Sequence, residues 1–149
     1  MAEAEKLEST AEWSLAETRN FYALLYTTNC LQELRKLARV RVVDNSALGR
    51  AATVAGKPAR IIHVYNKQEV ACLGDKVLLA IKGQKKRAYV VGCKQKQQPN
   101  IPRFDSNNVV LVEDNGSPVG TRITVPIPSA LRAKEGDFTK ILSLATRFV

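Results

Sequence analysis

Short apolar segments separated by turn residues recur along the chain from residue 39, and this pattern restricts the fold most strongly. In the segment 76–82, Val77, Leu79 and Ile81 alternate onto one face, as in a strand with one buried side. Closing a sheet of such strands into a small barrel removes its open edges. The sequence therefore predicts a mainly β fold with six strand-like segments, at residues 39–43, 60–65, 76–82, 88–92, 109–113 and 121–125.

Turn residues and a change of period complete this pattern. Gly74-Asp75 and Asp114-Asn115-Gly116 have the composition of turns beside strands. Near the C-terminus, Phe138, Ile141, Leu142 and Ala145 follow the spacing of a helix that buries one face. Asp137 is its expected N-cap, and residues 128–132 are expected to form one further helical turn, because proline is tolerated at a helix start.

The positive charge is concentrated in the middle of the chain. The formal net charge is +9, and residues 35–104 carry sixteen basic and three acidic side chains, whereas residues 1–34 carry two basic and six acidic ones. Ordinary solvated surfaces mix the two signs. A merely soluble basic protein remains the alternative, but this asymmetry favours a polyanionic partner such as a nucleic acid.

The pattern does not indicate catalysis or a metal site. His63 is the single histidine, and because it alternates with Ile61 in an apolar strand we expect a structural role for it. Cys30, Cys72 and Cys93 are spaced too widely for a disulfide framework or a zinc site. No apolar run has the length of a membrane span. We therefore expect no enzyme, no cofactor, no metal and no small-molecule substrate.

Basic residues around the segment 88–92 are expected to lie on one side of the barrel. A second surface could be formed by Arg39, Arg41, Arg50, Lys57 and Arg60. Aromatic residues make up 6% of the chain, so contacts to the RNA backbone are expected rather than base stacking. For the asparagines and the serine, a turn or cap role remains an open alternative. The residues expected to contact RNA are Arg39, Arg41, Asn45, Ser46, Arg50, Lys82, Lys85, Lys86, Arg87, Lys94, Lys96, Arg103, Asn107 and Asn108.

Several motifs, in order, closely resemble one family. RVRVVDNSALGR, AYVVGCK, RFDSNNVVLVEDNGSPVGTRITVPIP and FTKILSLA resemble the ribosomal protein L-fourteen family, which is universal in large ribosomal subunits. The resemblance extends from about Arg39 to Val149, and its details are most similar to the animal mitochondrial branch. The chain departs from the family where Ala47-Leu48 replaces a glycine and where residues 97–102 replace a glycine-containing loop.

The resemblance implies a five-stranded β-barrel with a projecting β-ribbon and short C-terminal α-helices, formed by residues 39–149. Residues 1–38 would be an N-terminal extension, either a targeting or a disordered segment. The implied function is that of a structural constituent of the mitochondrial large ribosomal subunit, binding its rRNA and contributing to a bridge between subunits. The alternative is a free-standing RNA-binding barrel that acts as a translation or RNA-processing factor.

The resemblance also implies protein partners. These are ribosomal proteins of the L-three and L-nineteen types, the small subunit, and the ribosome-silencing factor. Because Arg122 alternates with Ile123 in the last strand-like segment, we expect its side chain to point outward. The residues expected at the protein and subunit interface are Gly120, Thr121, Arg122 and Lys140.

Overall fold

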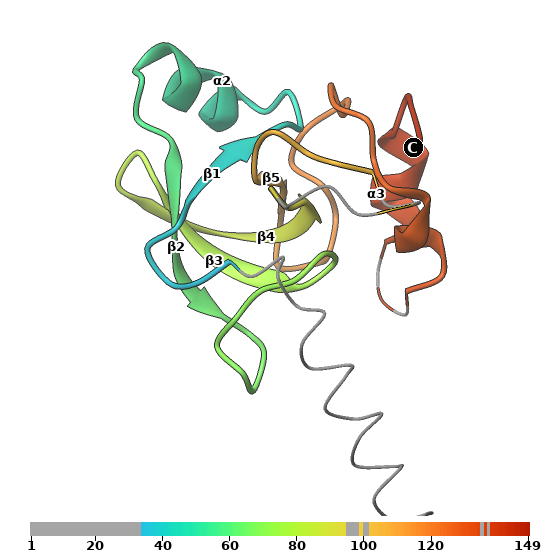
Figure 1. Ribbon diagram of the computed structural model, residues 1–149. Helices are drawn as coiled ribbons and strands as arrows, with labels where there is room; N and C mark the ends of the chain where they lie inside the picture. Colours follow the sequence, from blue (N-terminus) through green and yellow to red (C-terminus); the bar gives the residue numbers. More distant parts are fainter. Residues whose placement is uncertain (1–33, 95–98, 100–101, 135, 137) are drawn as a thin grey trace, which may run out of the picture. The chain divides into compact units, whose positions relative to one another are not determined.

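The computed structural model describes residues 34–94, 99, 102–134, 136 and 138–149 (Figure 1). Its five strands form a closed barrel in the order β1-β2-β3-β4-β5. Neighbouring strands are antiparallel, except that β1 closes the barrel against β5 in parallel. The predicted mainly β barrel is confirmed. Its elements are β1 (Arg39–Val42), α2 (Ala47–Val54), β2 (Ala59–Val64), β3 (Lys76–Ile81), β4 (Gln84–Gly92), β5 (Asn108–Val112), η1 (Ser129–Arg132) and α3 (Thr139–Leu144).

The barrel interior is filled by alternate side chains of the strands. In β3, Val77, Leu79 and Ile81 are buried as the alternation predicts, while the intervening residues are partly exposed. Leu34, before the first strand, also belongs to this core and exchanges two backbone hydrogen bonds with Ala71. Residues 1–33 of the predicted N-terminal extension lie outside the described residues, so its role stays a prediction.

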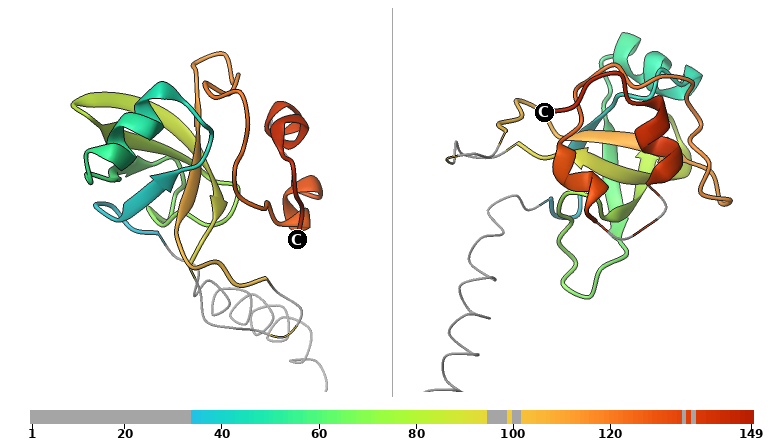
Figure 2. Two further views of the ribbon diagram at one scale, coloured as in Figure 1. Left: turned by 90° about the horizontal axis from the view of Figure 1, so that it is seen from above. Right: turned by 90° about the vertical axis from the view of Figure 1, so that its right-hand side faces the viewer.

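The second half of β4, from Ala88, and all of β5 are buried on both faces. Ala88 and Leu111 point into the barrel, whereas Tyr89 and Val110 point outward into a second core. That second core is completed by the chain from Ile123 onward, drawn in orange and red against one side of the barrel (Figure 2). Burial on both faces explains why these two strands contain continuous apolar runs in the sequence.

The segment 121–125 does not form the sixth strand that the sequence predicts, so that prediction is wrong. Within the described residues, Ile123 forms an isolated bridge with Ala145 and no longer ladder. Pro126 and Pro128 follow closely, and proline has no N–H to donate to a ladder. The segment is therefore held by single contacts and by the burial of Ile123, which is 0% exposed.

The helical elements agree with the sequence near the C-terminus and differ near the first strand. The turn at 128–132 is confirmed as η1, and α3 buries Ile141 as its spacing predicts. Asp137, the expected N-cap, lies outside the described residues. Helix α2 is not among the predicted elements; Ser46 is its N-cap and Ala52 joins the barrel core. Among the described residues, no helix is long and apolar enough to cross a membrane.

Candidate nucleic-acid interface

Three cations from three strands form a row on the outer surface of the barrel. Arg39 pairs with Arg60, Arg60 pairs with Ala80, and Ala80 pairs with Lys85. Directly paired residues project from the same face, and neighbouring strands lie about 4.8 Å apart. Arg39, Arg60 and Lys85 are all exposed, and none of them is ion-paired with another described residue. We call these three residues the cation row.

The row joins residues from the two basic surfaces that the sequence suggested. Lys85 comes from the group around 88–92, and Arg60 comes from the second group. The hairpin between β3 and β4, with its tip at Gly83, pairs Lys85 with Ala80. Because Ala80 also pairs with Arg60 on its other side, Arg60 and Lys85 project from the same face. The strand pattern alone could not align Arg60 with Lys85, since pairing register is not visible in the sequence.

A polar groove of about 570 Å³ lies beside the cation row. On its wall, the Arg87 Nη1 atom lies 2.8 Å from an Asp114 carboxylate oxygen, so part of the local positive charge is offset. Both side chains are substantially exposed, and an ion pair of this kind is weak. The groove is lined by Tyr65, Leu78, Lys85, Lys86, Arg87, Val112, Glu113, Asp114 and Asn115.

Two residues that the sequence predicts to contact RNA are engaged within the fold. Ser46 is 4% exposed, and its hydroxyl oxygen accepts the Gly49 N–H at 3.1 Å. Asn108 is 2% exposed, and its side-chain oxygen accepts the Ser106 hydroxyl at 2.7 Å. These hydrogen bonds correspond to the cap and turn roles that the sequence left open, and neither residue belongs to the cation row.

The remaining predicted RNA-contacting residues lie at several places on the surface. The Asn107 side-chain oxygen accepts the Lys94 N–H at 2.8 Å and so stabilises the loop between β4 and β5. Asn45 is exposed with a φ of 58° in the turn before α2. Lys96 lies outside the described residues. The other exposed predicted cations are Arg41, Arg50, Lys82, Lys94 and Arg103.

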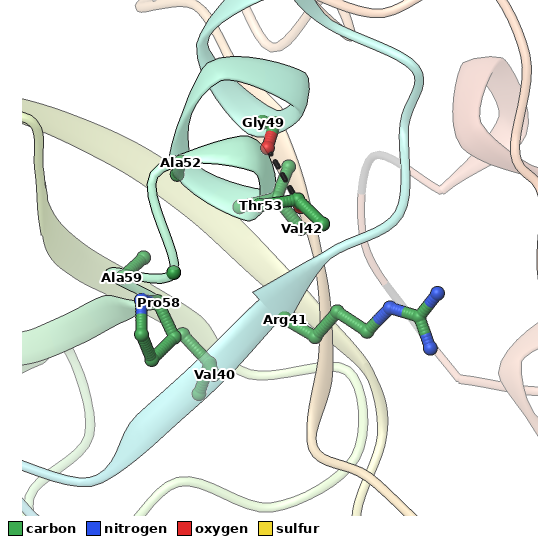
Figure 3. A pocket seen from close by; sticks show the side chains of 9 residues that line it. Val40, Arg41, Val42, Gly49, Ala52, Thr53, Pro58 and Ala59 are labelled. Atoms are coloured by element: carbon green, nitrogen blue, oxygen red, sulfur yellow. Dashed lines mark hydrogen bonds between the residues drawn. The ribbon is translucent and has the colours of Figure 1, made fainter.

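A second cavity, of about 310 Å³, lies between β1 and α2 (Figure 3). Val40, Val42 and Ala52 contribute to its mainly apolar lining, and the Arg41 guanidinium points away from it (Figure 3). The Thr53 hydroxyl donates to the Gly49 carbonyl at 3.0 Å, so it is engaged within the helix. A lining of this kind offers little to a phosphate group.

The four predicted interface residues differ in exposure. Gly120 is buried against the backbone of Asp44, where a Cβ atom would lie 1.6 Å from the Asp44 carbonyl oxygen. Thr121 and Arg122 are exposed, so Arg122 points outward as predicted, although no strand forms there. The Lys140 ammonium donates to the Ser117 hydroxyl at 3.1 Å on the exposed side of α3.

The environment of His63 corrects another expectation. A β-bulge between Ile61 and His63 shifts the alternation, so His63 is exposed rather than set in an apolar face. Its ring lies 5.3 Å from that of Tyr65 in an edge-on arrangement. Nearby, a hydrogen bond from the Lys36 ammonium lowers the pKa of the Glu69 carboxyl, with a further contribution from its charge.

Comparisons with known proteins agree with this geometry. Residues 33–149 match the family model described as ribosomal protein L14p/L23e. The chain is 56% identical over 122 residues to the large ribosomal subunit protein uL14m of Danio rerio, covering 82% of this chain and 85% of that protein. The predicted ribosomal family and the prediction of a non-enzymatic protein are thereby confirmed. The chain belongs to the L14p/L23e family of ribosomal proteins.

Proposed function

We propose that this protein is a structural constituent of the mitochondrial large ribosomal subunit and that its cation row binds the rRNA backbone. Family membership and the name of the Danio rerio relative support the place in the large subunit. The observation that carries RNA binding is the row itself: Arg39, Arg60 and Lys85 project in register from one face. A closed barrel holds these side chains on a rigid support, so little backbone entropy is lost on binding.

The row suits phosphate groups rather than base edges. Cations that neutralise phosphates release counterions, and this contribution to affinity is large and independent of sequence. Arginine adds a planar fork that can bind a phosphate with two hydrogen bonds. The sheet face thus offers two guanidinium groups and one ammonium group to the backbone of a folded RNA.

Removing the row should reduce the salt dependence of RNA binding. We expect simultaneous Arg39→Gln, Arg60→Gln and Lys85→Gln substitutions to lower the slope of log K against log salt by about one unit for each phosphate that is no longer neutralised, about three units in all. The measurement is a filter-binding titration of transcribed large-subunit rRNA between low and moderate salt.

A matched variant tests whether position matters beyond net charge. Lys67→Gln, Arg132→Gln and Arg147→Gln together remove the same charge from exposed positions outside the row that form no ion pair with another described residue. We expect the slope of this variant to stay close to that of the unsubstituted protein. An equal reduction of the slope in both triple variants would contradict a specific role of the row.

Sedimentation tests the place in the particle. A ribosomal constituent is buried among RNA and neighbouring proteins, so it should remain with isolated large subunits of mitochondria through moderate salt. A free-standing RNA-binding factor held by charge alone would dissociate steeply over the same range. Recovery of the protein only in the ribosome-free fractions would exclude the proposed function.

We also propose, from the family resemblance, that the surface around Arg122 contributes to contacts with the small subunit and the ribosome-silencing factor. Neighbours of the L-three and L-nineteen types are proposed on the same ground. Thr121, Arg122 and Lys140 are exposed and available for such contacts, whereas buried Gly120 would act by shaping the backbone that precedes them.

Arg122→Ala should separate this interface from folding. Because Arg122 is exposed, we expect its replacement to change the free energy of unfolding by less than about 0.5 kcal/mol. Joining of large and small subunits in sucrose gradients should nevertheless weaken. Loss of soluble folded protein, or subunit joining identical to that of the unsubstituted protein, would count against this interface.

A further inference from the structure

One exposed aromatic ring lies in the groove beside the cation row. Tyr65 directly follows β2 and is 49% exposed, although large apolar side chains of the described residues are mostly buried. It lines the groove together with Lys85, Lys86 and Arg87. The His63 and Tyr65 rings form a T-shaped pair with an interplanar angle of 86°, which limits the orientations available to Tyr65.

The groove combines the groups that a nucleotide requires. An aromatic ring can stack on a base of any identity, and cations beside it can hold the attached phosphate. The Asn115 amide and the Glu113 carboxylate, which also line the groove, offer a donor and acceptors to a base edge. The volume of about 570 Å³ lies within the range of about 300–1,000 Å³ typical of small-ligand sites.

Lys85 connects the groove to the cation row, because it belongs to both. A chain of phosphates lying along Arg39 and Arg60 therefore reaches the groove without leaving the sheet face. The charge of the groove also favours an RNA strand over a peptide. Three cations line the groove against two carboxylates, and one of these carboxylates already pairs with Arg87.

We propose that this groove takes one unpaired nucleotide of the bound RNA, with its base stacked on Tyr65 and its phosphate beside Lys85 and Lys86. The proposal rests on the proposed rRNA binding. It specifies what the groove binds, namely a nucleotide in a single-stranded or bulged part of the RNA. The Arg87–Asp114 pair does not block this arrangement, because exposed ion pairs contribute little to stability and can be displaced.

The test compares two RNA probes with the whole chain. One probe is a ten-nucleotide oligoadenylate, in which every base is unpaired, and the other is the same strand in a duplex with oligouridylate. We expect Tyr65→Ala to weaken oligoadenylate binding about 5- to 150-fold, the range of one stacked base, and to leave duplex binding unchanged. Fluorescence anisotropy at fixed salt measures both affinities.

Two variants serve as controls. Tyr65→Phe keeps the ring and should retain the affinity for oligoadenylate. Val54→Ala removes an apolar side chain that is 89% exposed on α2, outside the groove, and should affect neither probe.

The outcomes separate this proposal from the proposed function. If Tyr65→Ala binds both probes as the unsubstituted protein does, or weakens both equally, stacking in the groove is wrong while binding by the cation row stands. If the unsubstituted protein binds neither probe in a salt-dependent manner, both proposals fail. Selective weakening of single-strand binding, with recovery in Tyr65→Phe, supports the groove as a nucleotide site.

Discussion

Gly120→Ala is expected to unfold the barrel domain or to lower its free energy of unfolding by more than about 4 kcal/mol, which is exceptional for a single substitution. A methyl group there would lie 1.6 Å from the carbonyl oxygen of Asp44 and 2.5 Å from its carbonyl carbon. Both are backbone atoms, so no side-chain rotation can relieve the overlap. Urea denaturation followed by circular dichroism measures the change.

Gly83→Ala is the matched control for this substitution. Gly83 has a φ of 77° at the tip of the β3–β4 hairpin, where a Cβ atom would meet nothing within 4 Å. Alanine there bears only the backbone cost of the left-handed region, about 1–2 kcal/mol. If the two variants are destabilised equally, close packing of Gly120 on Asp44 is not the cause. Because Gly120 is buried, a defect of Gly120→Ala in ribosome assembly would result from impaired folding rather than from the loss of an interface side chain.

The second large effect is expected at Asp44, whose side chain connects the turn between β1 and α2 to β5. It is 0% exposed, and its two carboxylate oxygens accept the Ser46 N–H at 3.0 Å and the Leu111 N–H at 3.1 Å. Asp44→Ala leaves two buried donors without an acceptor. Each costs about 1–3 kcal/mol, so we expect a decrease of about 2–6 kcal/mol in the free energy of unfolding, measured by chemical denaturation.

Asp44→Asn tests whether hydrogen bonding accounts for that decrease. Asparagine has nearly the same shape and keeps one acceptor oxygen, but its amide nitrogen then faces a donor. We expect the stability of this variant to lie between those of the unsubstituted protein and Asp44→Ala. If Asn and Ala destabilise the protein equally, the retained acceptor contributes nothing, and the two hydrogen bonds do not explain the effect.

The strands were predictable because burial of strand side chains produces recognisable apolar patterns in the sequence, such as a repeat of two residues where one face is buried. The alternation of Val77, Leu79 and Ile81 located β3, and the continuous run in 109–113 located β5, because both of its faces are covered. The predicted strand at 88–92 contains only the second half of β4, which begins at Gln84. The first half contains Lys85, Lys86 and Arg87, which are not buried, so no apolar pattern marks it in the sequence.

The errors have specific physical causes. The segment 121–125 has strand composition, but its partner is the distant segment at Ala145, and nearby prolines prevent a longer ladder. Helix α2 contains Gly49, which lowers helix propensity. Glycine fits this position because a Cβ atom would lie 2.7 Å from a Val42 methyl group. The signal that could have located this helix was Ser46, an N-cap before two good helix formers.

The candidate site was only partly predictable, for a related reason. Composition identified a basic middle segment, but alignment of Arg60 with Lys85 depends on two strand registers. The low aromatic content argued against stacking in general and gave no information about one exposed ring. Tyr65 follows the bulge at His63, which shifts the alternation, and a bulge leaves no compositional trace.

The two-sided burial of β5 and of the second half of β4 has a consequence for biosynthesis. The polypeptide is synthesised from its N-terminus at about 5–20 residues per second, and the last residue of the five strands is Val112. The outer faces of β5 and of the second half of β4 remain uncovered until residues 123–149 have been made, because Ile123, Ile127 and Ile141 complete the second core. Even Val149, which donates a hydrogen bond to Ile127, contributes to this cover. During that interval, the apolar side chains that belong to the second core are exposed to chaperones and to other newly made chains.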